Sequence, residues 1–169
     1  MNSLLGLLGK DSVKVAHLER IYAANWASPG FAADVIRVMQ QLDSEVAWRA
    51  VWLLKRLARE HQLGETEVVR LAQCAEEMPH WASRLNLCQL FATTGCPSSA
   101  RDALFPYLAE CFADRRPMIR AWAISVLVGF QADKKYRLPV AVMLRKAGGD
   151  PAGSVRARLR RLGMKTSDR

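Results

Sequence analysis

The sequence lacks the short motifs by which many enzyme families are recognised. Its 169 residues contain no GxSxG nucleophile elbow, no phosphate-binding P-loop and no GxGxxG turn. His17, His61 and His80 are far apart, and none belongs to an HExxH pair that could bind a catalytic metal. We therefore expect no catalytic residue, no metal and no cofactor, and a protein that is not an enzyme.

Paired cysteine ligands are also missing. Cys74, Cys88, Cys96 and Cys111 show no CxxC spacing and have no neighbouring histidine at metal-ligand distance. Cys74, Cys88 and Cys111 fall on faces of expected helices, where a thiol acts as a small apolar filler. We expect all four to be reduced thiols in a cytoplasmic protein.

The apolar opening segment MNSLLGLLG does not have the character of an export signal or a membrane span. It lacks a basic start and is too short to cross a bilayer. We expect it to pack over the exposed end of the first helix pair, because an open end would leave apolar surface in water. No membrane is expected as a partner. Half of the residues are hydrophobic and 24% are charged, which is typical of one folded domain spanning residues 1–169.

A basic residue recurs along the chain at a nearly fixed interval. Arg49, Arg84, Arg120 and Arg156 are separated by 35, 36 and 36 residues, and Lys14 stands 35 before Arg49. Such a period indicates a helical repeat. Four residues after each marker stand Leu18, Leu53, Cys88, Ile124 and, breaking the pattern, Arg160, and one residue after stand Val15, Ala50, Leu85, Ala121 and Ala157. These two sets share one helical face, so each marked helix is expected to bury it.

A second apolar pattern precedes each marked helix, which indicates helical hairpins. Sixteen residues before the markers stand Ala33, Val68, Leu104 and Val140. Together with Gly, Pro and Ser breaks, the patterns predict helices at 13–24, 31–41, 45–60, 66–77, 79–94, 100–112, 116–131, 138–147 and 151–162. Ser12 is the expected cap of the first, residues 133–137 form a charged loop, and residues 164–169 form a frayed tail.

An aspartate stands six residues before three of the arginines. This arrangement, followed by an Ala- and Leu-rich run, resembles the HEAT repeat over about residues 12–162. The resemblance implies an all-α, right-handed superhelix of about four hairpins, with a ladder of hydrogen bonds between the acidic residue of each turn and the arginine of the second helix. The ladder pairs would be Asp43 with Arg49, Asp114 with Arg120, and Asp150 with Arg156. Met78 replaces the aspartate before Arg84 and interrupts the pattern there.

The net charge of +9 is concentrated at one end of the chain. Residues 134–169 carry eleven Lys and Arg against two Asp, whereas residues 1–133 carry fourteen charges of each sign. This basic end disfavours self-association through its own surface, and we expect a monomer. It could bind nucleic acid or an acidic protein, or serve only to keep the chain soluble.

Two sets of residues are candidate binding sites. In HEAT-like proteins the second helices line the concave face, and two sequence positions on them turn polar in the later repeats. These predict a protein-binding strip of Asn86, Gln89, Trp122, Ser125, Arg158 and Arg161. The other four tryptophans are expected in the core. The alternative is nucleic-acid binding, for which HEAT-like alkylpurine DNA glycosylases are a precedent, through Arg156, Arg158, Arg160, Arg161, Lys134, Lys135 and Arg137.

Overall fold

A computed structural model describes residues 4–10, 13–61 and 63–164, and every regular element within these ranges is a helix. The α-helices are α1 (Leu4–Leu8), α2 (Val15–Asn25), α3 (Phe31–Met39), α4 (Ser44–Glu60), α5 (Glu65–Gln73), α6 (Trp81–Thr94), α7 (Arg101–Phe112), α8 (Pro117–Leu127), α9 (Lys134–Gly148) and α10 (Gly153–Arg161). Short 3-10 helices are η1 (Ala75–Glu77), η2 (Ser98–Ala100) and η3 (Val128–Ala132). The prediction of an all-helical fold is confirmed for this part of the chain.

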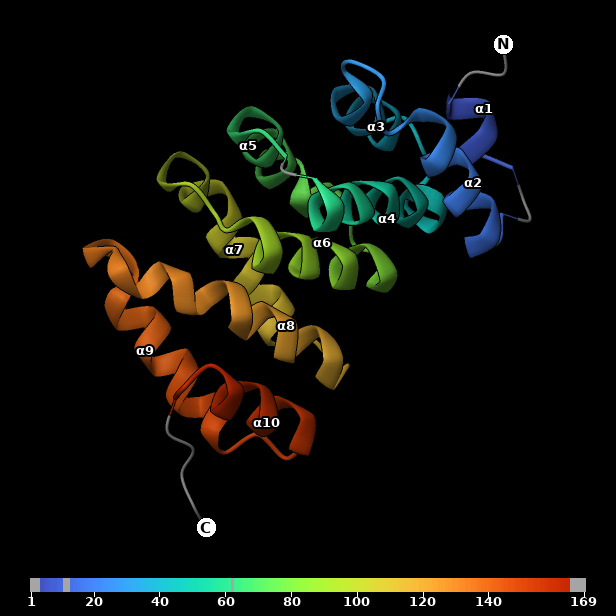
Figure 1. Cartoon of the computed structure of the whole chain (residues 1–169). Coiled ribbons are helices and arrows are strands. Elements are labelled where there is room, and N and C mark those ends of the chain that lie inside the picture. Colours follow the sequence, from blue (N-terminus) through green and yellow to red (C-terminus); the bar gives the residue numbers. More distant parts are fainter. Residues whose placement is uncertain (1–3, 11–12, 62, 165–169) are drawn as a thin grey trace.

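The helices follow one another from one end of the molecule to the other, and α9 and α10 lie farthest from α1 (Figure 1). The four helices that carry the marker arginines form one row, in which α4 packs against α6, α6 against α8 and α8 against α10. A second row contains α3, α5 and α7. Contacts between α3 and α4 and between α7 and α8 join the rows, and α9 packs on α10. The predicted pairing of a first with a second helix therefore appears in these three places.

One continuous cluster of buried side chains runs from Leu8 to Leu159. Leu18, Leu53, Cys88 and Ile124, which share one repeat position, have no exposed surface. In α10 Arg160 stands at this position and is exposed, whereas Leu159, which corresponds to the buried Leu87 and Ala123, has no exposed surface. The position directly after each marker was also predicted to be buried. This prediction is wrong in the first and last repeats, because Val15 is 50% exposed and Ala157 is also exposed.

The N-terminal helix covers the first helix pair, as the sequence predicts. α1 packs against α3 and α4, and Leu8 is fully buried. Arg49 donates hydrogen bonds to the carbonyl oxygens of Leu8, at 2.7 Å, and Lys10, at 2.5 Å. The proposed cap Ser12 lies outside the described residues, as do residues 165–169 of the expected tail.

Several helix boundaries differ from the prediction, and a side-chain cap explains one of them. The charged loop expected at 133–137 is wrong: α9 begins at Lys134, since the Asp133 carboxylate accepts a hydrogen bond from the Lys135 amide at 3.0 Å. α5 ends at Gln73 and continues as η1, and α8 changes to the tighter η3 at Val128. Gly30, with φ +80°, precedes α3, where a left-handed backbone favours glycine.

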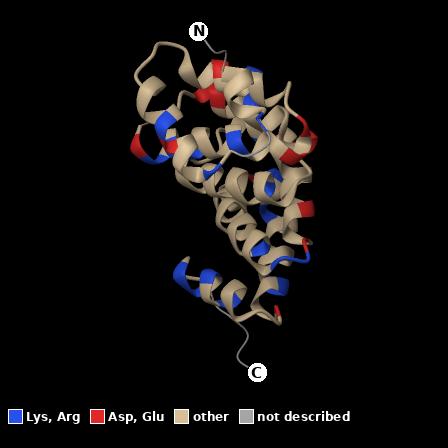
Figure 2. Ribbon diagram, turned by 90° about the vertical axis from the view of Figure 1, so that its right-hand side faces the viewer, with Lys and Arg blue, Asp and Glu red and all other residues tan. Residues whose placement is uncertain are grey.

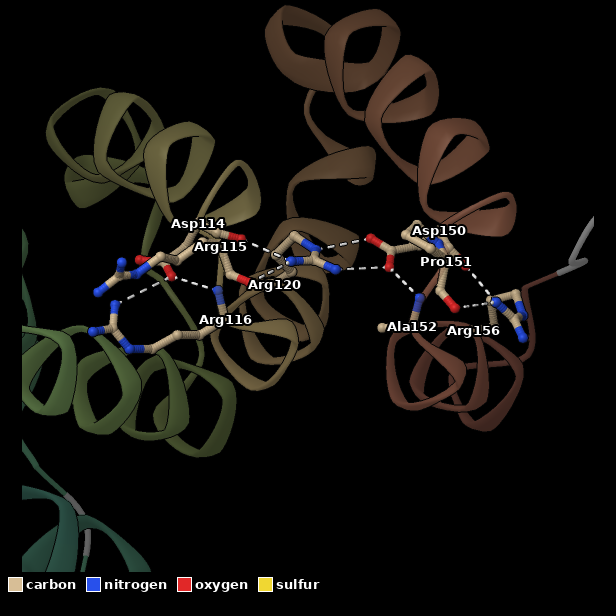
Figure 3. Close-up of polar contacts among 8 residues, drawn as sticks. All are labelled: Asp114, Arg115, Arg116, Arg120, Asp150, Pro151, Ala152 and Arg156. Atoms are coloured by element: carbon tan, nitrogen blue, oxygen red, sulfur yellow. Dashed lines mark hydrogen bonds and ion pairs between the residues drawn. The ribbon is translucent and has the colours of Figure 1, made fainter.

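A ladder of arginine contacts connects successive repeats, and its register differs from the predicted one (Figure 3). Arg120 donates to the main-chain oxygen of its own Asp114 at 2.8 Å, while both Arg120 Nε and Nη2 donate to the carboxylate of Asp150 at 2.8 Å. Asp150 belongs to the next repeat. Arg156 similarly donates to the main-chain oxygens of Asp150 and Pro151. Arg120 and Arg156 thus each reach the backbone of their own turn, and Arg120 also binds the carboxylate of the following turn.

The same register explains the interruption at Met78. Arg84 has an acidic neighbour, because it lies 3.6 Å from the carboxylate of Asp114 and 2.9 Å from Glu110. Met78 stands at the turn position from which a carboxylate would accept hydrogen bonds from Arg49, and its side chain is buried. Arg49 is directed instead toward the N-terminal segment, which supplies the Leu8 and Lys10 carbonyls. The missing carboxylate at Met78 therefore affects Arg49, the arginine of the preceding repeat, and not Arg84.

Arg120→Ala tests the ladder. The side chains of Arg120 and Asp150 are only 15% and 11% exposed, so removing one partner leaves a poorly solvated charge. We expect a loss of about 2–4 kcal/mol in the free energy of unfolding, measured by urea titration. Arg115→Ala, a change at an exposed neighbouring position, is the matched control and should cost about 0.5 kcal/mol or less. Equal losses in the two variants would show that the pair does not stabilise the fold.

The Asp150 carboxylate also predicts a dependence on pH. Hydrogen bonds from Arg120 hold the pKa of Asp150 below its usual value, so the folded state favours the ionised form. Its stabilising contribution is complete above the unfolded pKa of about 3.9 and disappears as pH falls through the lower folded pKa. The difference in unfolding free energy between the natural chain and Asp150→Asn should be constant above about pH 5 and shrink below about pH 4. A difference that is unchanged at low pH would contradict this role.

Candidate functional site

The first half of the predicted strip is a polar group between α4 and α6. Lys55 on α4 donates to the side-chain oxygens of Asn86, at 2.5 Å, and Gln89, at 3.0 Å. Asn86 also donates to the main-chain oxygen of Ala82 at 2.8 Å. Burial lowers the pKa of Lys55, and the nearby Arg59 lowers it further. The amide oxygens thus hold a partly desolvated ammonium group in place.

The second half of the strip joins α8 to α10. The Arg158 guanidinium lies 3.7 Å from the centre of the Trp122 ring, and its Nε donates to Ser125 Oγ at 2.6 Å. Ser125 in turn donates to the main-chain oxygen of Ala121 at 3.2 Å. Burial lowers the pKa of Arg158, with a smaller contribution from Arg161. A cation at this distance from an indole face is attracted by its π electrons, so Arg158 and Trp122 fix each other.

The structure corrects the expectation that the whole strip faces water. Asn86 is 7% exposed, because α6 lies between α4 and α8 and Lys55 extends over it. Trp122, Ser125 and Arg158 are half-buried, and Arg161 is exposed. The corresponding positions on α4, Val51 and Leu54, are completely buried. The strip therefore opens gradually toward α10, where its surface is most accessible.

The basic residues lie at the end of the molecule formed by α9 and α10. Figure 2 shows Lys and Arg predominating near the C-terminal end, whereas Asp and Glu lie mostly nearer the N-terminus. Among the residues considered for nucleic-acid binding, Lys134, Lys135, Arg137, Arg160 and Arg161 are exposed. Arg156 and Arg158 are half-buried and donate to groups of the chain itself. The predicted basic set is thus divided between accessible and internally bonded side chains.

Two tryptophans that were expected in the core lie on the surface. Trp26 is 41% exposed and stacks on His61, with ring centres 4.2 Å apart. Trp81 is 45% exposed, and the Arg116 guanidinium lies 5.5 Å from its ring centre. Trp48 and Trp52 are partly buried against the core. Trp26 and Trp81 are at a helix end and a helix start, where the helical period gives no guide to burial.

The histidines, cysteines and carboxylates of the described residues are scattered over the fold. Within them, no group of three or more His, Cys, Asp or Glu side chains is placed to hold a metal ion. Cys74, Cys88 and Cys111 are buried, as expected of apolar fillers, and Cys96 is half-buried. Cys96 lines a hollow of about 370 Å³ between α6 and α8, together with Arg101 and Ser125. Burial raises the pKa of Cys96 to about 11, so its thiol stays protonated and poorly nucleophilic at neutral pH.

The helices of the described segments also give no membrane span, since none combines the length and apolar character that crossing a bilayer requires.

The Lys55 group gives a testable prediction. Lys55→Met leaves the nearly buried oxygen of Asn86 without this donor and should lower the free energy of unfolding by about 1–3 kcal/mol, measured by chemical denaturation. Arg59→Met, one turn further along α4 and exposed, is the control and should cost about 0.5 kcal/mol or less. Lys55→Met combined with Asn86→Leu should recover part of the loss, because both polar partners are then absent. Strictly additive losses would contradict the coupling.

Comparison of the chain with protein-family models, curated proteins and solved structures finds no match. Its function is therefore inferred from the contacts of its own residues.

Proposed function

We propose that the protein is a non-enzymatic, HEAT-like scaffold that binds a partner protein along the concave face of a right-handed helical solenoid. The period of 35 to 36 residues, the row of α4, α6, α8 and α10, and the Arg120–Asp150 connection between repeats support this architecture. Solenoids offer extended surfaces to macromolecules and need no catalytic group. The second helices supply the binding face, which opens at α8 and α10.

The observation that carries the proposal is the stacking of Arg158 on Trp122. The ring and guanidinium are 3.7 Å apart and are held further by the bond to Ser125. An ordered aromatic and cationic pair loses little conformational freedom on binding, and Trp and Arg are enriched among interface residues that contribute most to affinity. The exposed Arg161 is one turn further along α10 and adds a second cation. An acidic protein surface complements this group.

Nucleic-acid binding is the second candidate, favoured by the exposed cations of α9 and α10. Arg160 and Arg161 on one helix and Lys134, Lys135 and Arg137 on the other could contact phosphates. The bonds of Arg156 and Arg158 within the chain reduce the donors available to such contacts. We therefore give the protein partner precedence.

Arg161→Glu tests the proposed face by reversing an exposed charge that is not needed for packing. Immobilised natural and variant chains are incubated with nuclease-treated cell lysate, and bound proteins are quantified by mass spectrometry. We expect at least one protein to be recovered in about tenfold smaller amount with Arg161→Glu than with the natural chain. Its recovery should also fall with Trp122→Ala, which should cost about 2 kcal/mol or more of binding energy. Arg70→Glu, an exposed charge reversal on α5, is the matched control and should have no effect.

Two outcomes would contradict the protein-binding proposal. The first is a set of captured proteins that is the same for Arg161→Glu and Arg70→Glu. The second is tight binding of labelled duplex DNA or single-stranded RNA at about 50 mM salt that falls about a hundredfold at 200 mM, because such a slope reports neutralised phosphates. The second outcome would favour the nucleic-acid function instead.

A further inference from the structure

The outer face of α9 carries an exposed aliphatic pair. Leu138 is 75% exposed and Val142 is 55% exposed, the highest values for large hydrophobic side chains in the described ranges. The two are four residues apart and therefore lie one above the other on the helix. Tyr136, Val140 and Leu144 are buried on the opposite face. The packing of α9 on the core thus leaves Leu138 and Val142 pointing away from it.

Basic residues frame this aliphatic pair on both sides. Lys134 and Arg145, eleven residues or three turns apart, flank one side, and Lys135 and Lys146, with the same separation, flank the other. All four are exposed, and α9 contains no acidic residue. Lys135 forms an ion pair with Asp102 of α7.

In the preceding repeat an acidic residue and a proline stand at the positions of the aliphatic pair. Thirty-six residues before Leu138 stands Asp102, thirty-six before Val142 stands Pro106, and the same interval relates Glu110 to Lys146. Both acidic residues are exposed on α7. The fold therefore accommodates a charged side chain at the position of Leu138, and packing within the chain does not require an aliphatic residue there. Exposed apolar side chains in a cationic frame are instead a feature of a contact surface.

The chemistry of the face distinguishes among classes of partner. Phosphate backbones attract the cations but make no use of two aliphatic side chains. A bilayer requires a broad apolar stripe, and the remaining apolar side of α9 is buried in the core. A second copy of the chain would bring like charges together. An amphipathic helix with an aliphatic stripe bordered by carboxylates matches both the pair and its frame.

We propose that the outer face of α9, defined by Leu138, Val142, Lys134, Lys135, Arg145 and Lys146, docks an acidic amphipathic helix of a partner protein. The Leu138–Val142 ridge packs between aliphatic side chains of that helix, and its carboxylates meet Lys134, Arg145 and Lys146, while Lys135 keeps its ion pair with Asp102. This face shares no residue with the Trp122 and Arg158 surface, so the inference does not rest on the proposed function.

The probe is a fluorescein-labelled 18-residue synthetic peptide with leucine at i, i+3, i+4 and i+7 positions and glutamate on the remaining face, followed by fluorescence anisotropy at about 50 and 200 mM salt. A scrambled peptide of the same composition is the peptide control. We expect the natural chain to bind the amphipathic peptide at least fivefold more tightly than the scrambled one. Leu138→Gln with Val142→Gln should weaken binding at least tenfold, and Leu138→Gln alone should weaken it less.

Matched protein variants separate this face from general charge attraction. Val15→Gln removes an aliphatic side chain of similar exposure at the other end of the molecule and should leave affinity unchanged. Arg161→Glu, which tests the other proposed surface, should change affinity less than twofold. Lys134→Gln with Arg145→Gln should weaken binding and reduce its dependence on salt. Thermal melting followed by circular dichroism checks that each variant is folded.

Several results would overturn the inference. The first is that the natural chain does not bind the amphipathic peptide. The second is that it binds the scrambled peptide equally well, and the third is that the Leu138→Gln, Val142→Gln variant has the same affinity as the natural chain. A loss caused by Arg161→Glu as large as that caused by the double variant would do the same. So would tighter, Leu138-dependent binding to vesicles of phosphatidylcholine and phosphatidylserine at 7:3, since this would identify a lipid surface as the occupant.

Discussion

The contact between Arg120 and Asp150 is the interaction on which the C-terminal half of the structure depends. One guanidinium binds the main chain of its own turn through Asp114 and Arg115, and also binds the carboxylate of the next repeat through two parallel hydrogen bonds. Only arginine has enough donors in a rigid plane to make both sets of bonds. The pair therefore fixes the turn before α10 relative to α8.

The position of α10 determines what surface the molecule presents. Because α10 packs on α8, Arg158 lies over Trp122 and reaches Ser125, and Arg161 is left in solvent. Because α9 packs with its Tyr136, Val140 and Leu144 side on the core, Leu138 and Val142 point outward among cations. The basic character of this end is thus displayed on two different surfaces with different apolar partners, an aromatic ring on one and an aliphatic pair on the other.

The sequence predicts the helices and the ladder residues, but not which residues of the ladder meet. A separation of six places Asp114 and Arg120 in one repeat, yet the Asp114 carboxylate accepts from the Arg116 amide at its own helix start and faces Arg84 of the preceding repeat. The direction of that carboxylate depends on the turn geometry, which no residue period specifies. The burial of Asn86 was missed for a similar reason, since it depends on the reach of Lys55 from another helix.

The site on α9 could not be found from the apolar pattern alone. The sequence predicts a charged loop at 133–137 and a helix that starts at residue 138, and only the Asp133 cap brings Lys134, Lys135 and Leu138 onto one continuous helix. A comparison of repeat positions would have given one signal, the change from Asp102 to Leu138. The exposure of Leu138, however, depends on which side of α9 is turned toward the core.

Native-state hydrogen exchange on Arg120→Ala tests most directly whether neighbouring repeats are held together locally. We expect faster amide exchange in α9 and α10, with protection in α3 through α6 unchanged, because each repeat depends mainly on its neighbours. An equal increase in exchange along all helices would contradict it and show that the chain opens as one cooperative unit.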